Sequence, residues 1–596
     1  MRTYRRLMSF LRPYRVQLWG SLLFAWAAMG MTVLIPWLVG QAINAIEDES
    51  KPDLLPLALA IFGAAILRMG LTVVRRLVAG KVSLGIEFDL RQLFYTHLQK
   101  LELGFFDTQQ TGQLMSRATV DLQAIRFFLG YGLIFITQTL LTIVLASTVM
   151  IIINPLLAAL ALIPAPFVVW VASRYNRVSR PAVQEVAQRV AELTAEAEEN
   201  VSGIRIVKAF AREEFQLHRF QRVVKRVFDQ SIYSTRLQAF FSPLIGLLPQ
   251  LGIALVLLVG GRMVIEGDLR LGNFTAFYTY LVMLAGPLRM LGVAMGMAQR
   301  AVASGNRMFE IIDREPTIQS PPDPIELPDG GGRVELRNVT EQYAAAPGSD
   351  HESVPALHDV SLEVDAGKTV ALVGPSGSGK TSLVALIARL YDPTEGTVLV
   401  DGVDVRDVEV EKLRAEVAFV ADDSFLFTAS VADNIAYARG AASRAEIEAA
   451  ARLAQADSFI RELPDGYDTR VGERGLTLSG GQRQRVAIAR ALLADPRILI
   501  LDDATSSVDA TTEAAIKAGL REAMTGRTTF IIAHRLSTVS LADEIIVLDH
   551  GAMVDRGTHE ELMEGCGFYR EIAEHGLADS VYLQRDLEDR EEMARL

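Results

Sequence analysis

The first half of the chain alternates long apolar runs with charged stretches, and the apolar runs are long enough to cross a membrane. A span needs about 20 mostly apolar residues, because an ionised side chain at mid-bilayer costs roughly 2.5–3.5 kcal/mol on insertion scales. One run, 127–173, is too long for a single helix and carries Asn154-Pro155 near its middle, which favours a turn. The pattern therefore predicts six spans, from the runs 16–46, 54–74, 127–173, 237–261 and 271–298.

Basic residues set the orientation of these spans. Five arginines precede the first run, whereas the short loop 47–53 that follows it is mostly acidic. Basic residues gather on the cytosolic side, so the N-terminus should be cytosolic and, after six spans, so should the C-terminal half. We expect a multi-pass integral membrane protein, placed in a bacterial plasma membrane.

The apolar half also contains two long charged connections and two arginines that lie inside apolar runs. The connections 76–126 and 174–236 are charged and compatible with helix, so they are expected to extend the spans into the cytosol at about 1.5 Å per residue. Arg68 and Arg289 lie inside apolar runs. Each is explained by snorkelling or structural pairing, or by contact with an anionic group of a transported molecule.

The polar half contains a phosphate-binding loop. Thr369–Gly374 reads as a buried strand, the next residues as a tight loop, and the sequence from Lys380 as an apolar helix. Glycines let backbone N–H groups surround phosphates, the lysine reaches the β- and γ-phosphates, and Thr381 can bind Mg²⁺. The predicted ATP-binding residues are Gly374, Pro375, Ser376, Gly377, Ser378, Gly379, Lys380, Thr381 and Ser382.

A second apolar strand, 497–501, ends on two acids. The first, Asp502, is expected to support a magnesium site, as in the Walker B strand of P-loop ATPases. The sequence therefore predicts ATP and Mg²⁺ as the ligands of this half.

The segment Leu478-Ser479-Gly480-Gly481-Gln482 resembles the signature of the ATP-binding cassette (ABC) family, and the resemblance covers nearly the whole chain. It implies a half-transporter of the multidrug or lipid exporter type, in which the signature of one subunit completes the ATP site of the other, so that a dimer is required. It also implies further roles: adenine stacking for Tyr343, the D-loop for 507–509 with Asp509, γ-phosphate sensing for His534, and coupling helices within 105–112 and 199–212.

These features predict an α-helical transmembrane bundle of six spans followed by an α/β P-loop ATPase domain. The expected boundaries are 1–312 for the transmembrane domain, 313–332 for a Pro/Gly-rich linker, 333–575 for the nucleotide-binding domain and 576–596 for a charged tail.

Two positions depart from the family pattern. Asp503 stands where a glutamate usually activates water, and it is one methylene shorter. Asp422 stands where a glutamine usually contacts Mg²⁺, and can still serve as a metal ligand. With the signature intact, we hypothesise a heterodimer whose site on this chain is slow. A homodimer with two slow sites, a nucleotide-binding regulatory subunit and a membrane-anchored ATPase without transport are the alternatives.

Composition narrows the partners further. The net charge of −12 does not suggest the clustered basic surface that nucleic acid requires. The single cysteine, Cys566, excludes an intramolecular disulfide. Aromatic and methionine residues in the last run suit either a hydrophobic or amphipathic cargo or ordinary helix packing: Phe274, Phe277, Tyr278, Tyr280, Met283, Met290 and Met295.

Overall fold

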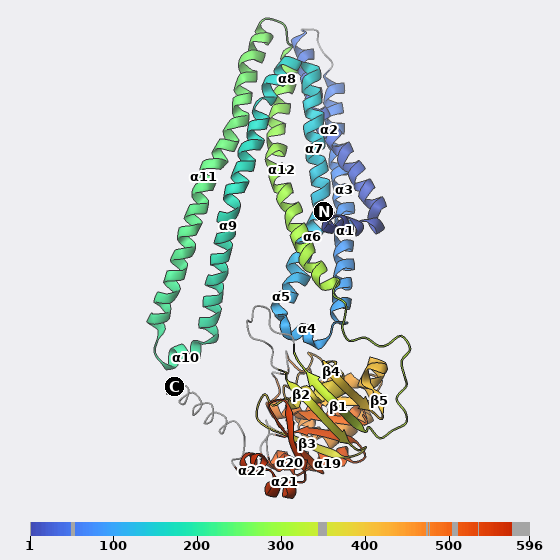
Figure 1. The fold of residues 1–596 in the computed structure, drawn as a ribbon. Coiled ribbons are helices and arrows are strands. Elements are labelled where there is room, and N and C mark those ends of the chain that lie inside the picture. The colour runs from blue at the N-terminus through green and yellow to red at the C-terminus, as the bar shows by residue number, and fades with distance from the viewer. Residues whose placement is uncertain are drawn as a thin grey trace. The chain divides into compact units, whose positions relative to one another are not determined.

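The computed structural model describes residues 2–48, 54–343, 355–472, 475, 477–502, 510–533 and 536–574. The chain divides into two compact units (Figure 1). Residues 1–99 and 112–314 form the first, here the helical unit, and residues 100–111 and 315–596 form the second, here the sheet unit. The segment 100–111 thus groups with the sheet unit, although both of its flanks belong to the helical unit. The boundaries expected from sequence stay a prediction, and the tail 576–596 lies outside the described residues.

The helical unit is built from long helices with short turns between them. Its elements are α1 (Arg2–Ser9), η1 (Arg12–Tyr14), α2 (Arg15–Glu47), α3 (Leu55–Leu98), α5 (Thr111–Ser116), the π-helical turn η2 (Arg117–Asp121), α6 (Leu122–Phe127), the π-helical turn η3 (Phe128–Gly132), α7 (Leu133–Ile153), α8 (Pro155–Leu162), α9 (Pro164–Ser202), α10 (Ile204–Ala209), α11 (Glu213–Ile265) and α12 (Leu271–Ile312).

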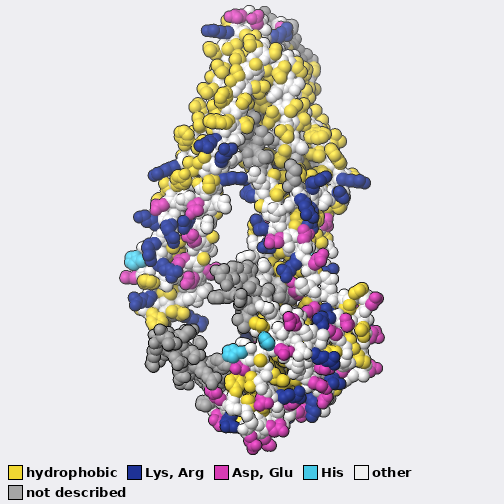
Figure 2. All heavy atoms as spheres, in the orientation of Figure 1, with side chains coloured by type: hydrophobic (Ala, Val, Ile, Leu, Met, Phe, Trp, Pro, Cys, Tyr) yellow, Lys and Arg dark blue, Asp and Glu magenta, His cyan; other side chains and the backbone are white. Residues whose placement is uncertain are grey.

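In the described part of the chain, five helical stretches are long and apolar enough to cross a membrane: 12–47, 55–98, 111–153, 155–202 and 213–265. The sixth predicted span falls on α12, whose apolar segment is Leu271–Leu284. On the face shown in Figure 2, hydrophobic side chains cover the apolar part of this unit, and Lys and Arg side chains appear where that band ends. The charged connections continue the helices beyond the band, as the sequence predicts.

Asn154 makes the predicted turn between the third and fourth spans. It leaves the helix with φ −159° and ψ 113°, and its side-chain oxygen accepts a hydrogen bond from the Leu157 N–H at 3.0 Å. Pro155 then starts α8, at a position where its missing N–H costs nothing. The fourth span is further divided, because Pro164 begins α9 directly after α8.

A buried cluster joins α2, α7, α8, α11 and α12 within the apolar part. Tyr280 is fully buried there, and its hydroxyl donates a hydrogen bond of 2.6 Å to the Val33 carbonyl. Transfer of a hydroxyl group from water to hydrocarbon without a hydrogen-bond partner costs about 4–8 kcal/mol. The Tyr280 hydroxyl therefore needs this bond, and the bond fixes how α12 meets α2.

The sheet unit contains, among its described residues, a four-stranded antiparallel sheet and a six-stranded sheet. The antiparallel sheet has the order β2 (Leu357–Val364), β1 (Val334–Glu341), β4 (Glu395–Val400), β5 (Val403–Asp404). The other sheet has the order β10 (Ala552–Gly557), β9 (Glu544–Asp549), β3 (Thr369–Val373), β8 (Thr528–Ile532), β7 (Ile498–Asp502), β6 (Val417–Val420), and its pairs are parallel except for β10 with β9. Strands β3, β7 and β8 are buried along their whole length, which explains their continuous apolar sequences.

Two large hydrophobic clusters organise the helices of this unit. One lies between the two sheets and includes the P-loop helix, and the other joins β6 and β7 to a group of helices that includes the signature helix. The helices and turns are α4 (Leu103–Thr108), α13 (Lys380–Ile387), η4 (Val405–Asp407), α14 (Val410–Ala415), α15 (Val431–Ile435), η5 (Ala436–Ala438), α16 (Arg444–Leu453), α17 (Asp457–Glu462), η6 (Gly466–Asp468), α18 (Gly480–Leu493), α19 (Ala510–Met524), α20 (Leu536–Val539), α21 (His559–Gly565) and α22 (Gly567–Glu574). Cys566 is buried in a third cluster, as expected for a structural thiol.

Candidate nucleotide site

The phosphate-binding loop connects β3 to α13, as the sequence predicts. Gly379 adopts φ +98° immediately before the helix, and a Cβ there would lie 2.5 Å from the Ala356 carbonyl oxygen. At Gly374 a Cβ would lie 2.1 Å from the Leu548 carbonyl oxygen. Glycine is therefore required at both ends of the loop. The first N–H groups of α13 face the space that the loop surrounds, where a helix N-terminus favours an anion.

Lys380 is 5% exposed and folds back over the loop. Its Nζ donates to the carbonyl oxygens of Gly374 and Pro375 at 2.9 and 2.8 Å, and to the Ser378 hydroxyl at 3.4 Å. A buried ammonium is costly unless its protons are bonded, so these acceptors hold the charge beside the loop. Phosphate oxygens are stronger acceptors for the same charge.

Thr381 and Asp502 meet at the end of the central strands. The threonine hydroxyl is 3.3 Å from Asp502 Oδ2, and Asp502 is 8% exposed at the C-terminal end of β7. β8 separates β7 from β3 in the sheet, so the pairing depends on the parallel order β3-β8-β7. A hydroxyl and a carboxylate that converge next to a phosphate loop form an oxygen set of the kind that Mg²⁺ prefers.

Tyr343 lies against the start of the P-loop helix. Its hydroxyl donates to Ser382 Oγ at 2.9 Å, and its ring meets the Tyr391 ring edge to face, with centroids 5.1 Å apart. Glu341, 5% exposed, is close by, and burial raises the pKa of its carboxyl group. Tyr391 and Glu341 belong to no motif, so no sequence pattern points to either residue.

The signature segment forms the N-terminus of α18. Ser479 is the N-cap: its hydroxyl accepts from the Gln482 N–H, while Gln482 Oε1 accepts from the Ser479 N–H at 2.8 Å. Ser479 is exposed, Gly480 is half-buried and Gly481 is buried. The segment therefore presents a capped, exposed helix start on a different hydrophobic cluster from that of the P-loop helix.

Asp422 follows β6 in an exposed loop. Behind this loop, Asn434 is 1% exposed and exchanges hydrogen bonds with the backbone of Phe427 at 2.8 and 3.0 Å. Arg490 of α18 donates to the Asn434 carbonyl at 2.8 Å and to the Phe425 carbonyl at 3.1 Å. The loop that carries Asp422 is thus attached to the helix that carries the signature. Asp503, Asp509 and His534 lie outside the described residues, and so does the side chain of Arg289.

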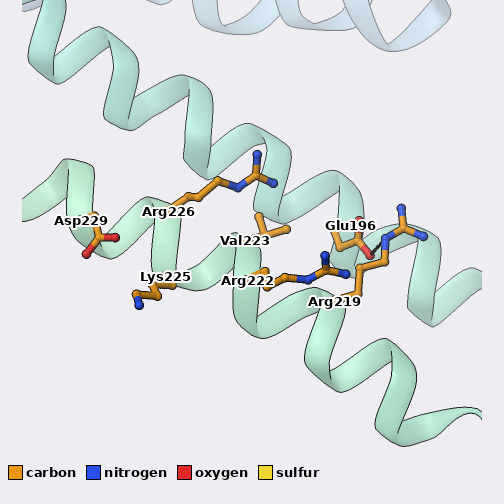
Figure 3. Close-up of a pocket in the computed structure, with 7 residues that line it drawn as sticks. All are labelled: Glu196, Arg219, Arg222, Val223, Lys225, Arg226 and Asp229. Atoms are coloured by element: carbon orange, nitrogen blue, oxygen red, sulfur yellow. Dashed lines mark ion pairs between the residues drawn. The ribbon is translucent and has the colours of Figure 1, made fainter.

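A cavity of about 610 Å³ lies in the helical unit, between α9 and α11. Figure 3 shows that Glu196 of α9 faces Arg219 of α11, and their ion pair measures 2.8 Å. The other lining residues are Arg222, Val223, Lys225, Arg226 and Asp229. None of the predicted site residues lines this cavity, and its ion pair joins the two helical extensions to each other.

Two family models match the chain. One, described as the ABC transporter transmembrane region, covers residues 18–288, and the other, described as ABC transporter, covers residues 357–506. The second range contains the P-loop, Asp502 and the signature. The chain is also 36% identical over 573 residues to the ATP-dependent lipid A-core flippase of Syntrophus aciditrophicus (strain SB), a match that covers 96% of this chain and 94% of the relative. The chain belongs to the ABC transporter family.

This ABC transporter is also 38% identical over 568 residues to the multidrug efflux ATP-binding/permease protein of Mycobacterium bovis (strain BCG / Pasteur 1173P2), over 95% of this chain and 47% of that longer protein. Its structure resembles that of a bacterial Atm1-family ABC exporter with ATP bound, with a TM-score of 0.78, 31% identity, and coverage of 94% and 97% of the two chains.

These matches confirm the predicted fold class, a helical exporter-type membrane part fused to an α/β nucleotide-binding part. The ABC transporter is a multi-pass integral membrane protein, and its ATP-binding domain is that of a transport ATPase.

Proposed function

We propose that this ABC transporter exports a hydrophobic or amphipathic substrate as one half of a heterodimer, in which its own ATP site is slow. The observation that carries the proposal is the contrast within the sheet unit. The signature is intact and forms an exposed, capped helix start, whereas the positions expected to act on water and magnesium hold Asp503 and Asp422.

The chain's own residues account for nucleotide binding in this proposal. Lys380 would exchange its loop carbonyls for phosphate oxygens, the loop glycines would supply backbone donors, and Tyr343 would stack on adenine. Thr381 and Asp502 would hold Mg²⁺, with Asp422 as a further ligand. The bound ion would neutralise charge on the phosphates.

The exposed surfaces support a dimer. Ser479 is exposed, and its helix packs in a different hydrophobic cluster from the P-loop helix, so the signature can serve the site of a second subunit. In the helical unit, α10 joins the polar ends of α9 and α11 (Figure 1), and it carries Ile206 and, just after it, Phe210, which are 67% and 73% exposed. Apolar residues at the tip of a polar extension are usually covered by protein.

The short side chain of Asp503 is the reason to expect slow ATP hydrolysis at this chain's own site. Its carboxylate is one methylene shorter than that of glutamate, and a displacement of about 1 Å in a catalytic group costs on the order of 100-fold in rate. An intact signature, by contrast, serves the partner's site. The pairing would then be asymmetric, with fast turnover on the partner's P-loop only.

The substrate class rests on the relatives. One is named a lipid A-core flippase and another a multidrug efflux protein. The apolar and aromatic side chains of α12 suit a hydrophobic or amphipathic cargo, although Phe277 and Tyr280 are buried in helix packing.

ATP turnover by the full-length chain purified alone in lipid nanodiscs tests the asymmetry. We expect slow hydrolysis that Asp503→Glu raises by about 100-fold, because the longer side chain restores the reach to the attacking water. The matched control is Asp465→Glu, the same change at an exposed position of the sheet unit, which should leave turnover unchanged.

Other results would point elsewhere. Vigorous hydrolysis by the unmodified chain alone, abolished by Asp503→Asn, refutes the asymmetric site and favours a homodimer. If co-expression with a second half-transporter yields ATP-dependent uptake of Hoechst 33342 into inverted vesicles, Ser479→Ala in this chain should abolish it. Nucleotide binding without uptake or turnover in any pairing would identify a regulatory subunit instead.

A further inference from the structure

A line of four side chains connects helix α4 to the P-loop helix within the sheet unit. The Tyr391 hydroxyl donates to Asp107 Oδ2 at 2.6 Å, and the Tyr391 ring contacts the Tyr343 ring edge to face at 5.1 Å. The Tyr343 hydroxyl donates to Ser382 Oγ at 2.9 Å. Ser382 comes two residues after Lys380, so the line ends at the phosphate loop.

Helix α4 is attached to the sheet unit at several points. Near its start, the Glu102 carboxylate accepts a hydrogen bond from the Thr317 N–H at 3.2 Å. A Cβ on Gly104 would lie 3.6 Å from the Tyr391 ring, so the backbone of α4 passes directly over that ring. Phe105 of α4 is buried as well, with only 3% of its surface exposed. Tyr391 is therefore the residue that touches both α4 and the tyrosine expected to stack on adenine.

We propose that Tyr391 is a positioning residue: its ring sets the orientation of Tyr343 at the adenine position, and its hydroxyl ties helix α4 to that position through Asp107. The inference rests on the proposed role of Tyr343 in binding ATP. It adds that adenine binding and the attachment of α4 depend on one and the same side chain.

The two contacts of Tyr391 have separate physical origins. The edge-to-face contact between the Tyr391 and Tyr343 rings depends on the quadrupoles and the shapes of the two rings. It does not require the Tyr391 hydroxyl. The bond to Asp107 is a hydrogen bond to a charged acceptor, and this does not require the contact with Tyr343. Burial, the bond to Asp107 and the charge of that carboxylate raise the pKa of the Tyr391 hydroxyl, so it stays a donor.

Two variants of the full-length chain, purified alone in lipid nanodiscs so that its own ATP site is the one measured, separate these contacts. Tyr391→Phe keeps the ring and removes the hydroxyl. The KM for MgATP should stay unchanged, while amide hydrogen exchange of residues 103–108 in the presence of MgATP should become about tenfold faster. Tyr391→Leu removes both contacts, and it should also raise the KM for MgATP by about three- to tenfold at nearly unchanged kcat.

Tyr467→Phe is the matched control, because the Tyr467 hydroxyl donates to Asp457 at 2.7 Å in the same unit, away from the nucleotide site. This change should alter neither the KM nor the exchange of residues 103–108. Asp107→Ala should reproduce Tyr391→Phe, and the double variant should show no additional effect on exchange, since both changes break the same bond.

Two results would overturn the inference. Exchange of residues 103–108 in Tyr391→Phe that equals the unmodified protein would show that the hydroxyl does not hold α4. An unchanged KM in Tyr391→Leu would show that the ring does not position Tyr343. These outcomes are distinct from a failure of the proposed function, in which the unmodified chain itself would not retain MgATP.

Discussion

Arg490 should be the residue that holds the Asp422 loop to the signature helix. Its guanidinium donates to the Asn434 carbonyl at 2.8 Å, to the Phe425 carbonyl at 3.1 Å and to Asn434 Oδ1 at 3.1 Å. Burial lowers the pKa of this guanidinium, which nevertheless stays charged. Replacing it by methionine keeps an unbranched apolar stem and removes all three bonds.

The cost follows from what Arg490→Met leaves behind. The carbonyl of Asn434, a residue that is 1% exposed, loses a charged donor, and a buried acceptor left without a bond costs about 1–3 kcal/mol. The Phe425 carbonyl belongs to an exposed contact and can bond water instead. Part of this cost is offset because the buried charge no longer has to be desolvated. A net loss of about 1–2 kcal/mol in local stability is expected, which corresponds to about 5- to 30-fold faster opening of the loop.

Hydrogen exchange of residues 425–435 in the full-length protein measures this opening directly. The expected result is exchange about 5- to 30-fold faster in Arg490→Met, with no change in α22. Arg485→Met is the matched control, since Arg485 lies on the same helix and donates instead to the Gln455 carbonyl at 2.8 Å. Exchange of 425–435 within twofold of the unmodified protein, in a folded Arg490→Met variant, would refute the assigned role.

Two further predictions concern the nucleotide site. Asp502→Asn should weaken trinitrophenyl-ATP binding in the presence of Mg²⁺ by about 10- to 100-fold, because Thr381 and Asp502 form the oxygen set next to the loop. Binding in EDTA should stay unchanged. Equal losses of affinity with and without Mg²⁺ would contradict this role. Glu341→Gln should raise the thermal stability of the protein at neutral pH. Burial raises the pKa of Glu341 above its ordinary 4.5, so ionisation of this carboxyl group lowers stability as the pH rises from 4.5 through the raised pKa. The advantage of the variant should therefore vanish below pH 4.5. A pH-independent difference in melting temperature would rule out ionisation as the cause.

Short-range sequence features predicted most of the fold. The apolar runs located the spans, Asn154-Pro155 located the turn between α7 and α8, and the Gly-rich loop between β3 and α13 lies where its glycines placed it. Each of these features is decided within a few residues, by side-chain hydrophobicity, by capping or by backbone freedom at glycine. The role of Asp502 was also suggested, because a polar residue at the end of a buried strand is visible in the sequence.

The contacts that connect the site to its surroundings required the tertiary structure. Tyr391 lies in no motif and is 284 positions from Asp107 of the segment 105–112, yet their side chains are joined by a hydrogen bond. Arg490 and Asn434 likewise meet only in the fold. The motifs assign Thr381 and Asp502 to one magnesium site, but their direct contact depends on the strand order β3-β8-β7. Local patterns of residues specify which segments span, turn and bind phosphate, since those properties depend on a few neighbouring positions. Packing alone decided which distant side chains meet, because a hydrogen bond depends on a few tenths of an ångström that no sequence pattern specifies.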